Sequence, residues 1–314
     1  ITVTDIVHGE ISVNLATLDD FVLLKSDGFP TYHLAHVVDD HAMQTTHVIR
    51  GDEWLSSLPK HVLLFRALNL EPPQYAHLAL LHNAQHKKLS KRDGDVSVES
   101  FLAWCLPEAL VNFVALLGWN VQGDQEIYTM PELVAAFGLS RVHRAPAVVD
   151  FQKLEWMNGE YLRVRAPAEI IAAIRATGIT MPTTDEAFME RVLVLEQPRM
   201  KRLDALPAWY FAPYQRDVPL AWKNTDAAIT KSNLEAVIQK LETIAGWGSD
   251  TTPAELESIV KPWITERGLG VGEVLWPVRV ALSGQKASPS PFDLAWLYGK
   301  DETIRRLQHA IATL

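Results

Sequence analysis

A short basic segment carries the sharpest chemical signal in the sequence. His86-Lys-Lys-Leu-Ser-Lys-Arg-Asp-Gly94 has five basic or potentially basic side chains among its first seven residues, and Ser90 stands between two lysines. Ammonium groups neutralise the negative charge that develops on a phosphate, and a serine hydroxyl adds a directional donor. The apolar run Leu78–Leu81 before it predicts a strand, so the segment would leave a sheet end, where α/β proteins bind ligands. A solvated surface loop is the alternative interpretation of the same composition.

The residues before the basic segment predict a parallel α/β sheet. Glu10–Leu15 alternates polar and apolar residues, as a half-buried strand does, and Phe21–Leu24 is a short apolar run suited to a buried strand. Strands and helices then alternate at the spacing of a parallel sheet with crossover helices. The other expected elements are a turn over 25–32, a helix over His33–Asp40, a strand over Thr46–Ile49 and a helix over Ser56–Leu68.

After residue 96 the sequence predicts helices. Thr252-Pro253 before Ala-Glu-Leu-Glu is a helix start, with a capping hydroxyl, proline at the first helical position and acids in the first turn. The expected fold class is therefore α/β followed by all-α. The expected helices cover Val98–Trp104, Glu108–Leu117, Met130–Phe137, Asp150–Trp156, Ala168–Ala176, Asp185–Val194, Lys231–Ile244, Pro253–Arg267 and Thr303–Thr313.

Composition excludes several classes of protein. With 48% hydrophobic and 21% charged residues, the 314-residue chain can build a packed core and is not a disordered polymer. No apolar stretch approaches the roughly 20 residues of a membrane-spanning helix. The single cysteine, Cys105, excludes an internal disulfide and a cysteine-rich zinc site. We expect a soluble protein of a reducing compartment, either the cytoplasm or the matrix of an organelle.

Charge and histidine content give weaker signals. The net charge of −9 lies in residues 1–160, but an acidic total does not exclude RNA binding where basic groups cluster. Asp39-Asp40-His41 at a helix end predicts capping and structural hydrogen bonds, not a metal site. The scattered histidines lack ligand spacing with cysteine and are expected to be packing or surface residues: His33, His47, His61, His77 and His82.

Lys88-Leu-Ser-Lys-Arg92 resembles the lysine-serine-lysine signature of class I aminoacyl-tRNA synthetases, in the form used by glutamyl-tRNA synthetases. Other segments similar to that family follow in the family's order and cover nearly the whole chain: Asp20–Ala35, Val37–His41, His47–Trp54, Pro107–Leu110, Leu117–Trp119, Phe151–Gly159 and Pro277–Gly284. The resemblance implies three regions. Residues 1–95 would be the C-terminal part of a Rossmann-type catalytic domain, 96–160 a helical stem-contact region, and 161–314 a helical anticodon-binding domain.

The resemblance also implies an activity. The family joins glutamate to tRNA(Glu) through a glutamyl-adenylate, with ATP as substrate and Mg²⁺ carried mainly by the phosphates, so we expect no metal held by protein groups. Positioning and charge stabilisation dominate such phosphoryl chemistry. By resemblance, Lys91 stabilises the leaving pyrophosphate, while Lys88 and Ser90 help to close the loop. A monomer without membrane contact is expected.

Two substrate pockets follow from the same resemblance. Arg50 matches the arginine that binds the side-chain carboxylate of glutamate, a task for which a guanidinium fork is suited. Tyr32 and His36 line this pocket, although relatives often carry Asn at the position of His36. Arg50 could instead be an ordinary ion-pair partner of its acidic neighbours Asp52 and Glu53. The nucleotide is held, in the family, at positions matching Glu53, Leu80 and Leu81 together with Lys91.

The third expected site reads RNA. Glutamyl synthetases of bacterial type read the anticodon with a helical domain, whereas their glutaminyl relatives use β-barrels, and residues 161–314 are predicted to be helical. Arg199 matches the arginine that contacts the last anticodon base, where it can donate two hydrogen bonds to a splayed cytosine. Arg279 and Ser288 fall on two further anticodon-contact positions. Arg199 could also be a surface charge beside Lys201 and Arg202.

The family's other ATP signature, His-x-Gly-His, occurs nowhere in the chain. We therefore expect a synthetase truncated at its N-terminus, which would not activate glutamate by itself. One alternative is a non-catalytic tRNA-binding relative. Another is an enzyme that transfers glutamate to a modified tRNA base, but such relatives lack the helical anticodon domain.

Overall fold

A computed structural model describes residues 1–90, 97–120, 123–212, 215–216, 218–223, 225–248 and 251–314. The chain divides into two compact units, Ile1–Tyr161 and Leu162–Leu314. The first contains a β-sheet and helices, while the described part of the second is helical, so the expected order of α/β followed by all-α is confirmed. No helix in the described ranges is long and apolar enough to cross a membrane.

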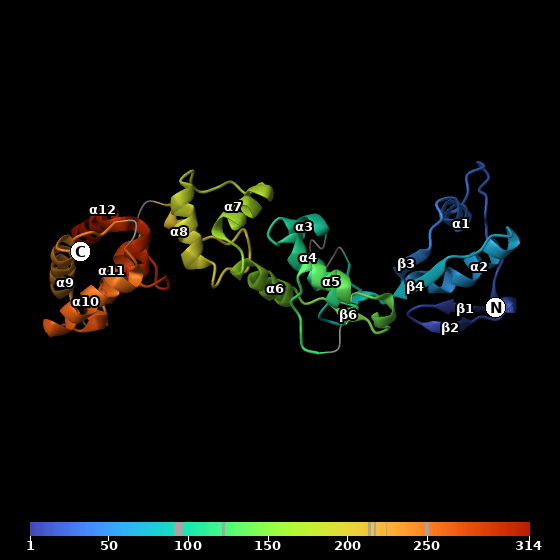
Figure 1. Cartoon of the computed structure of the whole chain (residues 1–314), viewed down its shortest axis with the longest axis horizontal. Coiled ribbons are helices and arrows are strands. Elements are labelled where there is room, and N and C mark those ends of the chain that lie inside the picture. The colour runs from blue at the N-terminus through green and yellow to red at the C-terminus, as the bar shows by residue number, and fades with distance from the viewer. Residues whose placement is uncertain (91–96, 121–122, 213–214, 217, 224, 249–250) are drawn as a thin grey trace. The chain divides into compact units, whose positions relative to one another are not determined.

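The first unit is built on a four-stranded sheet (Figure 1). Its strands are β1 (Thr2–Asp5), β2 (Gly9–Ser12), β3 (His47–Gly51) and β4 (Gln74–Leu78), in the spatial order β2-β1-β4-β3. β1 and β2 form an antiparallel hairpin, whereas β4 is parallel to both β1 and β3. The β3–β4 register sets Arg50 opposite His77. The predicted parallel sheet is therefore present, with one antiparallel strand at its edge.

Two helices accompany this sheet, α1 (Tyr32–Ala42) and α2 (Leu58–Ala67), as predicted. Leu58 and Val62 of α2 pack with Val3 and Tyr75 of the sheet in one buried cluster. Val37 of α1 packs against Leu64 and Phe65 of α2 in a second cluster. Pro59 lies in the first turn of α2, where its missing N–H costs no hydrogen bond. These contacts fix α1 and α2 beside the carboxyl end of β3.

Two predicted strands are wrong or misplaced. Phe21–Leu24 forms only an isolated bridge from Leu24 to Pro30, and Val22 and Leu24 are 62% and 59% exposed, so their apolar side chains do not join a core. The tight turn that follows is present, with Gly28 at φ +84°. The strand predicted over 78–81 is split, because β4 ends at Leu78 and β5 (Leu81–His82) pairs instead with β6 (Ala147–Val148).

The rest of the first unit is helical, as predicted. Its helices are α3 (Val98–Leu102), α4 (Pro107–Leu116), α5 (Met130–Ala136) and α6 (Phe151–Arg163), with short 3₁₀ turns η1 (Leu15–Thr17), η2 (Asp52–Ser57) and η4 (Leu139–Arg141). Trp119, Tyr128 and Leu133 form the buried cluster beside α4 and α5.

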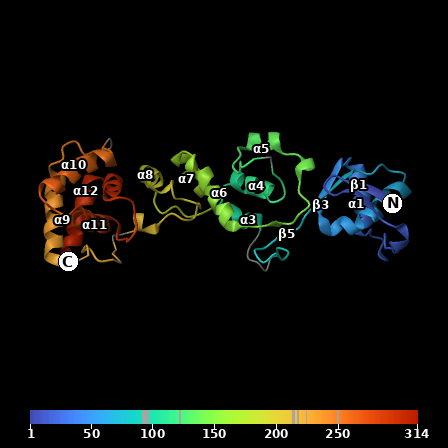
Figure 2. The same ribbon diagram turned by 90° about the horizontal axis from the view of Figure 1, so that it is seen from below.

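The second unit contains α7 (Pro167–Ala176), α8 (Glu186–Glu196), the 3₁₀ turn η5 (Ala208–Tyr210), α9 (Ala227–Glu242), α10 (Pro253–Glu266), α11 (Val271–Ser283) and α12 (Pro291–Ala312). Helices α9 to α12 gather as one bundle (Figure 2) around a large apolar core. Helix α11 was not predicted, and its interior Pro277 is a residue that ordinarily ends a helix. Helix α12 is longer than predicted and is broken at Gly299, where φ is +74°.

Candidate active site and RNA-contact residues

Arg50 lies at the carboxyl end of β3, and its guanidinium is held by side chains from two other elements. Nε donates to His77 Nε2 on the neighbouring strand β4, at 3.1 Å. Nη2 bonds to Nδ1 of His61, on α2, at 3.1 Å. Nη1 is buried and has no hydrogen-bond partner within the described residues. A cation with a buried, unsatisfied donor is a favourable site for an anionic group.

The hydrogen bonds continue outward from both histidines. His77 Nδ1 donates to the Asp5 carboxylate at 2.7 Å, and Asp5 also accepts the backbone N–H groups of Val7 and His8, each at 2.9 Å. On the other side, His61 Nε2 lies 2.8 Å from Nδ1 of His33. Asp5, His61 and His77 are all essentially inaccessible to solvent. The site is therefore a buried polar network that ends on β1 and α1.

Burial and the neighbouring cations keep both imidazoles neutral. Burial, with the charges of His36, Arg50 and others, lowers the pKa of His61 to about 3. Burial also lowers the pKa of His77, against the opposing effect of its hydrogen bond to Asp5. For Asp5, burial alone would raise the pKa, but the hydrogen bonds from His77, His8 and Val7 outweigh it and hold the pKa below its ordinary value.

Aromatic rings form the wall beside Arg50. The guanidinium carbon lies 5.6 Å from the ring centroid of Trp54, and the ring of Tyr32 lies 4.6 Å from that of Trp54. The ring of His36 lies 5.2 Å from Tyr32 and 4.2 Å from His61. The structure thus brings Arg50, Tyr32 and His36 into one cluster, as the sequence predicts.

His36 has one satisfied nitrogen and one unsatisfied one. Its Nδ1 donates to Asp40 at 3.0 Å, whereas its buried Nε2 has no partner among the residues described. The Arg50 guanidinium bonds to His77 and His61, and within the described residues it forms no ion pair with Asp52 or Glu53, the alternative partners considered from the sequence. The Asp52 carboxylate is bonded to His8 Nε2 at 2.8 Å.

The cationic segment follows β4 and β5 as a tight hairpin. His82 and Lys88 form an antiparallel bridge, and the Asn83 side chain caps the turn by accepting the backbone N–H groups of Gln85 and Lys87. Lys88 and Ser90 are exposed, while Lys91 and Arg92 lie outside the described residues. Arg50 lies near the carboxyl end of β3, and the hairpin follows the adjacent parallel strand β4 by way of β5; the carboxyl ends of parallel strands are where ligands bind in such sheets.

The three expected nucleotide residues follow β3 and β4 along the chain. Glu53 is exposed in the turn after β3. Leu80 is half-buried, and Leu81 lines an apolar cavity of about 650 Å³ together with Ile49, Leu78 and residues of α4 and α5.

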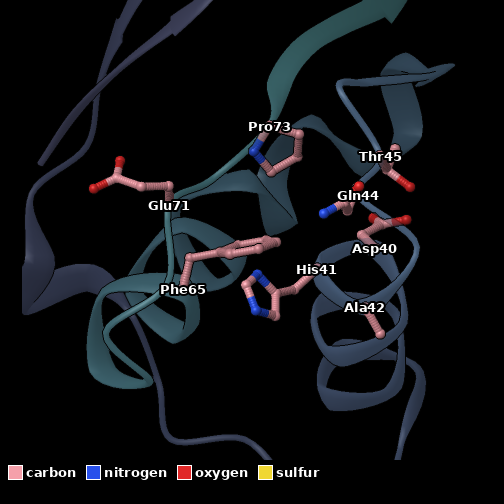
Figure 3. A pocket seen from close by; sticks show the side chains of 8 residues that line it. All are labelled: Asp40, His41, Ala42, Gln44, Thr45, Phe65, Glu71 and Pro73. Carbon is pink, nitrogen blue, oxygen red and sulfur yellow. The ribbon is translucent and has the colours of Figure 1, made fainter.

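A second, more polar cavity of about 370 Å³ lies at the C-terminal end of α1 (Figure 3). His41 lies beside the ring of Phe65 there, and the carboxylates of Asp40 and Glu71 point in different directions. Asp40 serves as the acceptor for His36, which is the structural role expected of this acidic motif. No three His, Cys, Asp or Glu residues in the described ranges are grouped to hold a metal ion.

Arg199 lies just after α8 and is fixed by Glu196. Its Nε and Nη2 donate to the two oxygens of that buried carboxylate at 2.8 and 2.9 Å, and Nη2 also reaches the Leu195 carbonyl at 3.1 Å. Tyr210 donates to the same carboxylate. The Arg199 side chain is still 52% exposed, so it can reach a ligand while its orientation is constrained.

Arg279 and Ser288 lie close together in the second unit, at the junction of α11 and α12. Arg279 donates from Nη2 to the Lys286 carbonyl at 3.0 Å, which ties α11 to the loop that contains Ser288. The guanidinium carbon also stacks 4.7 Å from the ring centroid of Trp276. Sequence analysis did not single out Trp276, although its spacing three residues before Arg279 places it one helical turn away.

Two family matches cover almost the whole chain. Residues 1–156 match the tRNA synthetases class I (E and Q), catalytic domain, and residues 161–311 match an anticodon binding domain. The chain therefore belongs to the class I aminoacyl-tRNA synthetases of the glutamate and glutamine group. This is the class that the sheet-end site and the helical second unit define.

Within that class, the similar proteins are glutamate–tRNA ligases. The chain is 40% identical to the glutamate–tRNA ligase of Flavobacterium johnsoniae and 38% identical to that of Chlorobium phaeovibrioides, over 99% of its own length in both cases. A crystal structure of a glutamate tRNA ligase from Elizabethkingia meningosepticum, in complex with its amino acid, superposes on 100% of the chain with a TM-score of 0.84 at 34% identity. The chain spans 65%, 62% and 66% of the lengths of these three proteins.

Proposed function

We propose that the protein to which this chain belongs attaches glutamate to tRNA(Glu) at the expense of ATP, through a glutamyl-adenylate. The observation that carries the proposal is the buried, unsatisfied Nη1 of Arg50, at the sheet end of a chain that resembles glutamate–tRNA ligases over nearly all its length. A carboxylate is one of the anionic groups that a guanidinium binds by strong, charge-assisted hydrogen bonds.

Arg50 would bind the side-chain carboxylate of glutamate. The ring of Trp54 lies beside the guanidinium and the ring of Tyr32 packs against Trp54, so the ligand would be partly screened from water and the charge-assisted bonds would be strengthened. His36 belongs to the same cluster, with its ring 5.2 Å from that of Tyr32. Glutamine, with a neutral amide, would satisfy the guanidinium less well, which supports glutamate as the substrate.

The nucleotide would lie beside the cationic hairpin. In the first step the α-carboxylate of glutamate attacks the α-phosphate of ATP, the bond to the β-phosphate breaks, and pyrophosphate leaves with the electron pair. Lys91, assisted by Lys88 and Ser90, would neutralise that leaving group. Glu53, Leu80 and Leu81 would hold the adenosine. ATP would bring its Mg²⁺ mainly through phosphates and water.

In the second step a terminal ribose hydroxyl of tRNA(Glu) attacks the acyl carbon of the adenylate, and AMP leaves. Arg199, Arg279 and Ser288 would contact the anticodon, and residues 96–160 the stem. The regions 1–95, 96–160 and 161–314 would thus serve catalysis, stem contact and anticodon binding. We further propose that the protein acts as a monomer in the cytoplasm or in the matrix of an organelle.

The test begins with the DNA that precedes the codon for Ile1. We expect an in-frame sequence that encodes His-x-Gly-His, and a protein from the complete frame that exchanges pyrophosphate into ATP only when glutamate is present. Lys91→Ala should abolish the exchange, while Arg66→Lys, on the exposed face of α2, should leave it unchanged.

The 314-residue chain alone should bind tRNA(Glu) without catalysing the exchange. A complete frame without the His-x-Gly-His sequence, combined with retained tRNA binding, would contradict the ligase and favour a non-catalytic tRNA-binding relative. Exchange activity in the 314-residue chain would show that the missing signature is dispensable.

A further inference from the structure

We propose that Asp5, His77 and His61 are positioning residues that lock the Arg50 guanidinium in one orientation and leave Nη1 as the donor for a ligand carboxylate. This inference rests on the proposed function, because only there is Arg50 assigned to the carboxylate of glutamate. None of the three residues stands out in the sequence, and the sequence analysis treats both histidines as packing or surface residues.

The backbone brings these groups together from three elements. Arg50 and His77 are register partners on the parallel strands β3 and β4, so their side chains leave the sheet at the same level. Asp5 ends β1, the strand on the other side of β4, and it accepts both the backbone N–H and the Nδ1–H of His77, at 3.1 and 2.7 Å. His61 comes from α2 and closes the opposite side of the guanidinium.

The donors and acceptors in this hydrogen-bond network can be assigned in one way only. The Asp5 carboxylate accepts, so His77 must carry its proton on Nδ1 and accept from Arg50 through Nε2. A guanidinium only donates, so His61 must accept through Nδ1 and carry its proton on Nε2, from which it donates to His33. A second proton on either imidazole would set two N–H groups against each other.

These hydrogen bonds leave Nη1 as the guanidinium nitrogen available to a ligand. With Nε and Nη2 each donating to an imidazole, the plane of the guanidinium is fixed and Nη1 is the nitrogen without a partner in the described part of the chain. The rings of Trp54 and Tyr75, 5.6 and 5.9 Å from the guanidinium carbon, exclude water from its faces. A carboxylate that reaches Nη1 would therefore meet a donor that needs no reorientation, which lowers the cost of binding.

The other charged groups near the network are consistent with neutral imidazoles. Lys60, His36 and Arg50 all disfavour a proton on His33. Asp52 favours a proton on His77, but it is the weakest of the influences on that ring, and it is engaged by His8. Asp40 is engaged by His36. Burial is the largest influence on the pKa of His33, His61 and His77, and it lowers the pKa of each ring.

The test is ¹⁵N NMR of the histidine and arginine side chains in the 314-residue chain at pH 7. We expect His77 in the Nδ1–H form and His61 in the Nε2–H form, with a slowly exchanging Nε–H on Arg50. The opposite tautomer of either histidine, or an imidazolium signal, would overturn the proposal without the need for any variant.

Variants test the direction of the effect. In Asp5→Asn an amide N–H can replace the accepting oxygen, so His77 should change to its Nε2–H form and the Arg50 Nε–H signal should shift and exchange at least tenfold faster. His61→Gln should shift the Arg50 Nη2 signal, because it replaces the imidazole that accepts from Nη2. His47→Gln, at an exposed position of β3, should change neither signal. An Arg50 spectrum that is unchanged in both Asp5→Asn and His61→Gln would overturn the proposal.

A titration with L-glutamate separates the inference from the proposed function. We expect L-glutamate to shift the Arg50 Nη1 signal in the wild-type chain, and the same shift in Asp5→Asn to need at least a tenfold higher glutamate concentration. This result supports both the inference and the proposed function. If glutamate leaves the Arg50 signals unchanged while the tautomers are as assigned, the carboxylate site fails and the positioning of Arg50 stands.

Discussion

Arg50 shows how a single side chain can depend on residues far away in the sequence. Motif resemblance predicts Arg50, Tyr32 and His36, and the structure brings these three together. The resemblance gives no reason to assign Asp5 to the site. Asp5 is linked to Arg50 through its hydrogen bond to His77, which lies 72 residues further along the chain. Pairing β3 with β4 in register would have identified His77 as the neighbour of Arg50. However, the strand was predicted over Leu78–Leu81, whereas β4 covers Gln74–Leu78.

Replacement of Arg50 by lysine tests the network through stability. A single ammonium cannot satisfy both imidazole acceptors, so Arg50→Lys should lower the free energy of unfolding by about 1–3 kcal/mol, the cost of an unsatisfied buried polar group. Arg66→Lys, at an exposed position of α2, should change it by less than about 0.5 kcal/mol. Urea unfolding measures both, and equal effects of the two variants would contradict the network.

Acid stability provides a second test at this scale. Because folding lowers the pKa of His61 to about 3, the unfolded chain binds more protons below about pH 6.5, so stability is full above that pH and falls as the pH decreases towards 3. The slope should be roughly 1.4 kcal/mol per pH unit for one such histidine, and His77 adds to it. His61→Gln should flatten the curve measured by urea unfolding at several pH values. If stability falls with decreasing pH as steeply in His61→Gln as in the exposed control His47→Gln, a neutral, buried His61 is contradicted.

At the scale of elements, periodicity predicts most helices, including α10 with its interior Pro262, but it misses α11 and most of α12. Helix α11 was missed because Pro277 lies inside it, and only the last part of α12 was found because Gly299 interrupts the helix. Both are tolerated by tertiary packing, since Pro277 and Leu297 are buried in the second unit. The wrong strand at Phe21–Leu24 is the converse case, an apolar run that finds no neighbouring strand to pair with along its length.

Gly284, which ends α11, is the glycine whose replacement should cost most. It has φ +71°, and a Cβ there would lie 1.9 Å from the Gln215 carbonyl oxygen, so backbone must move in Gly284→Ala. Gly268 has φ +67° and open space, which makes Gly268→Ala the control for conformational strain alone. We expect about 1–2 kcal/mol for Gly268→Ala and clearly more for Gly284→Ala by thermal unfolding. Similar losses in the two variants would show that the contact with Gln215 is unimportant.

At the scale of the whole molecule, charge and domain order were readable from composition and the order of elements. The acidic excess lies in residues 1–160, while residues 161–314 have equal numbers of acidic and basic side chains. If a protein of this balance binds RNA, as proposed, it would do so through a few well-placed cations and not through a broad basic surface. The chain divides into two compact units after Tyr161, while the assignment of regions 1–95, 96–160 and 161–314 stays a prediction.

Arg199 is the cation that should make this binding specific. Its guanidinium is oriented by the buried Glu196, and a bidentate contact to one base typically discriminates by about 1–3 kcal/mol. Arg199→Lys should remove most of that preference, because lysine cannot keep both the pairing with Glu196 and a two-bond contact. Arg305→Lys, with a side chain 68% exposed in the same unit, is the matched control.

The most direct measurement is the affinity of the 314-residue chain for a tRNA(Glu) transcript, compared with the same transcript in which guanine replaces the last anticodon base. We expect tighter binding of tRNA(Glu), by about tenfold or more, with the difference lost in Arg199→Lys and kept in Arg305→Lys. Equal affinity for the two transcripts, or no binding of either, would contradict the assignment of this chain to a tRNA(Glu) ligase.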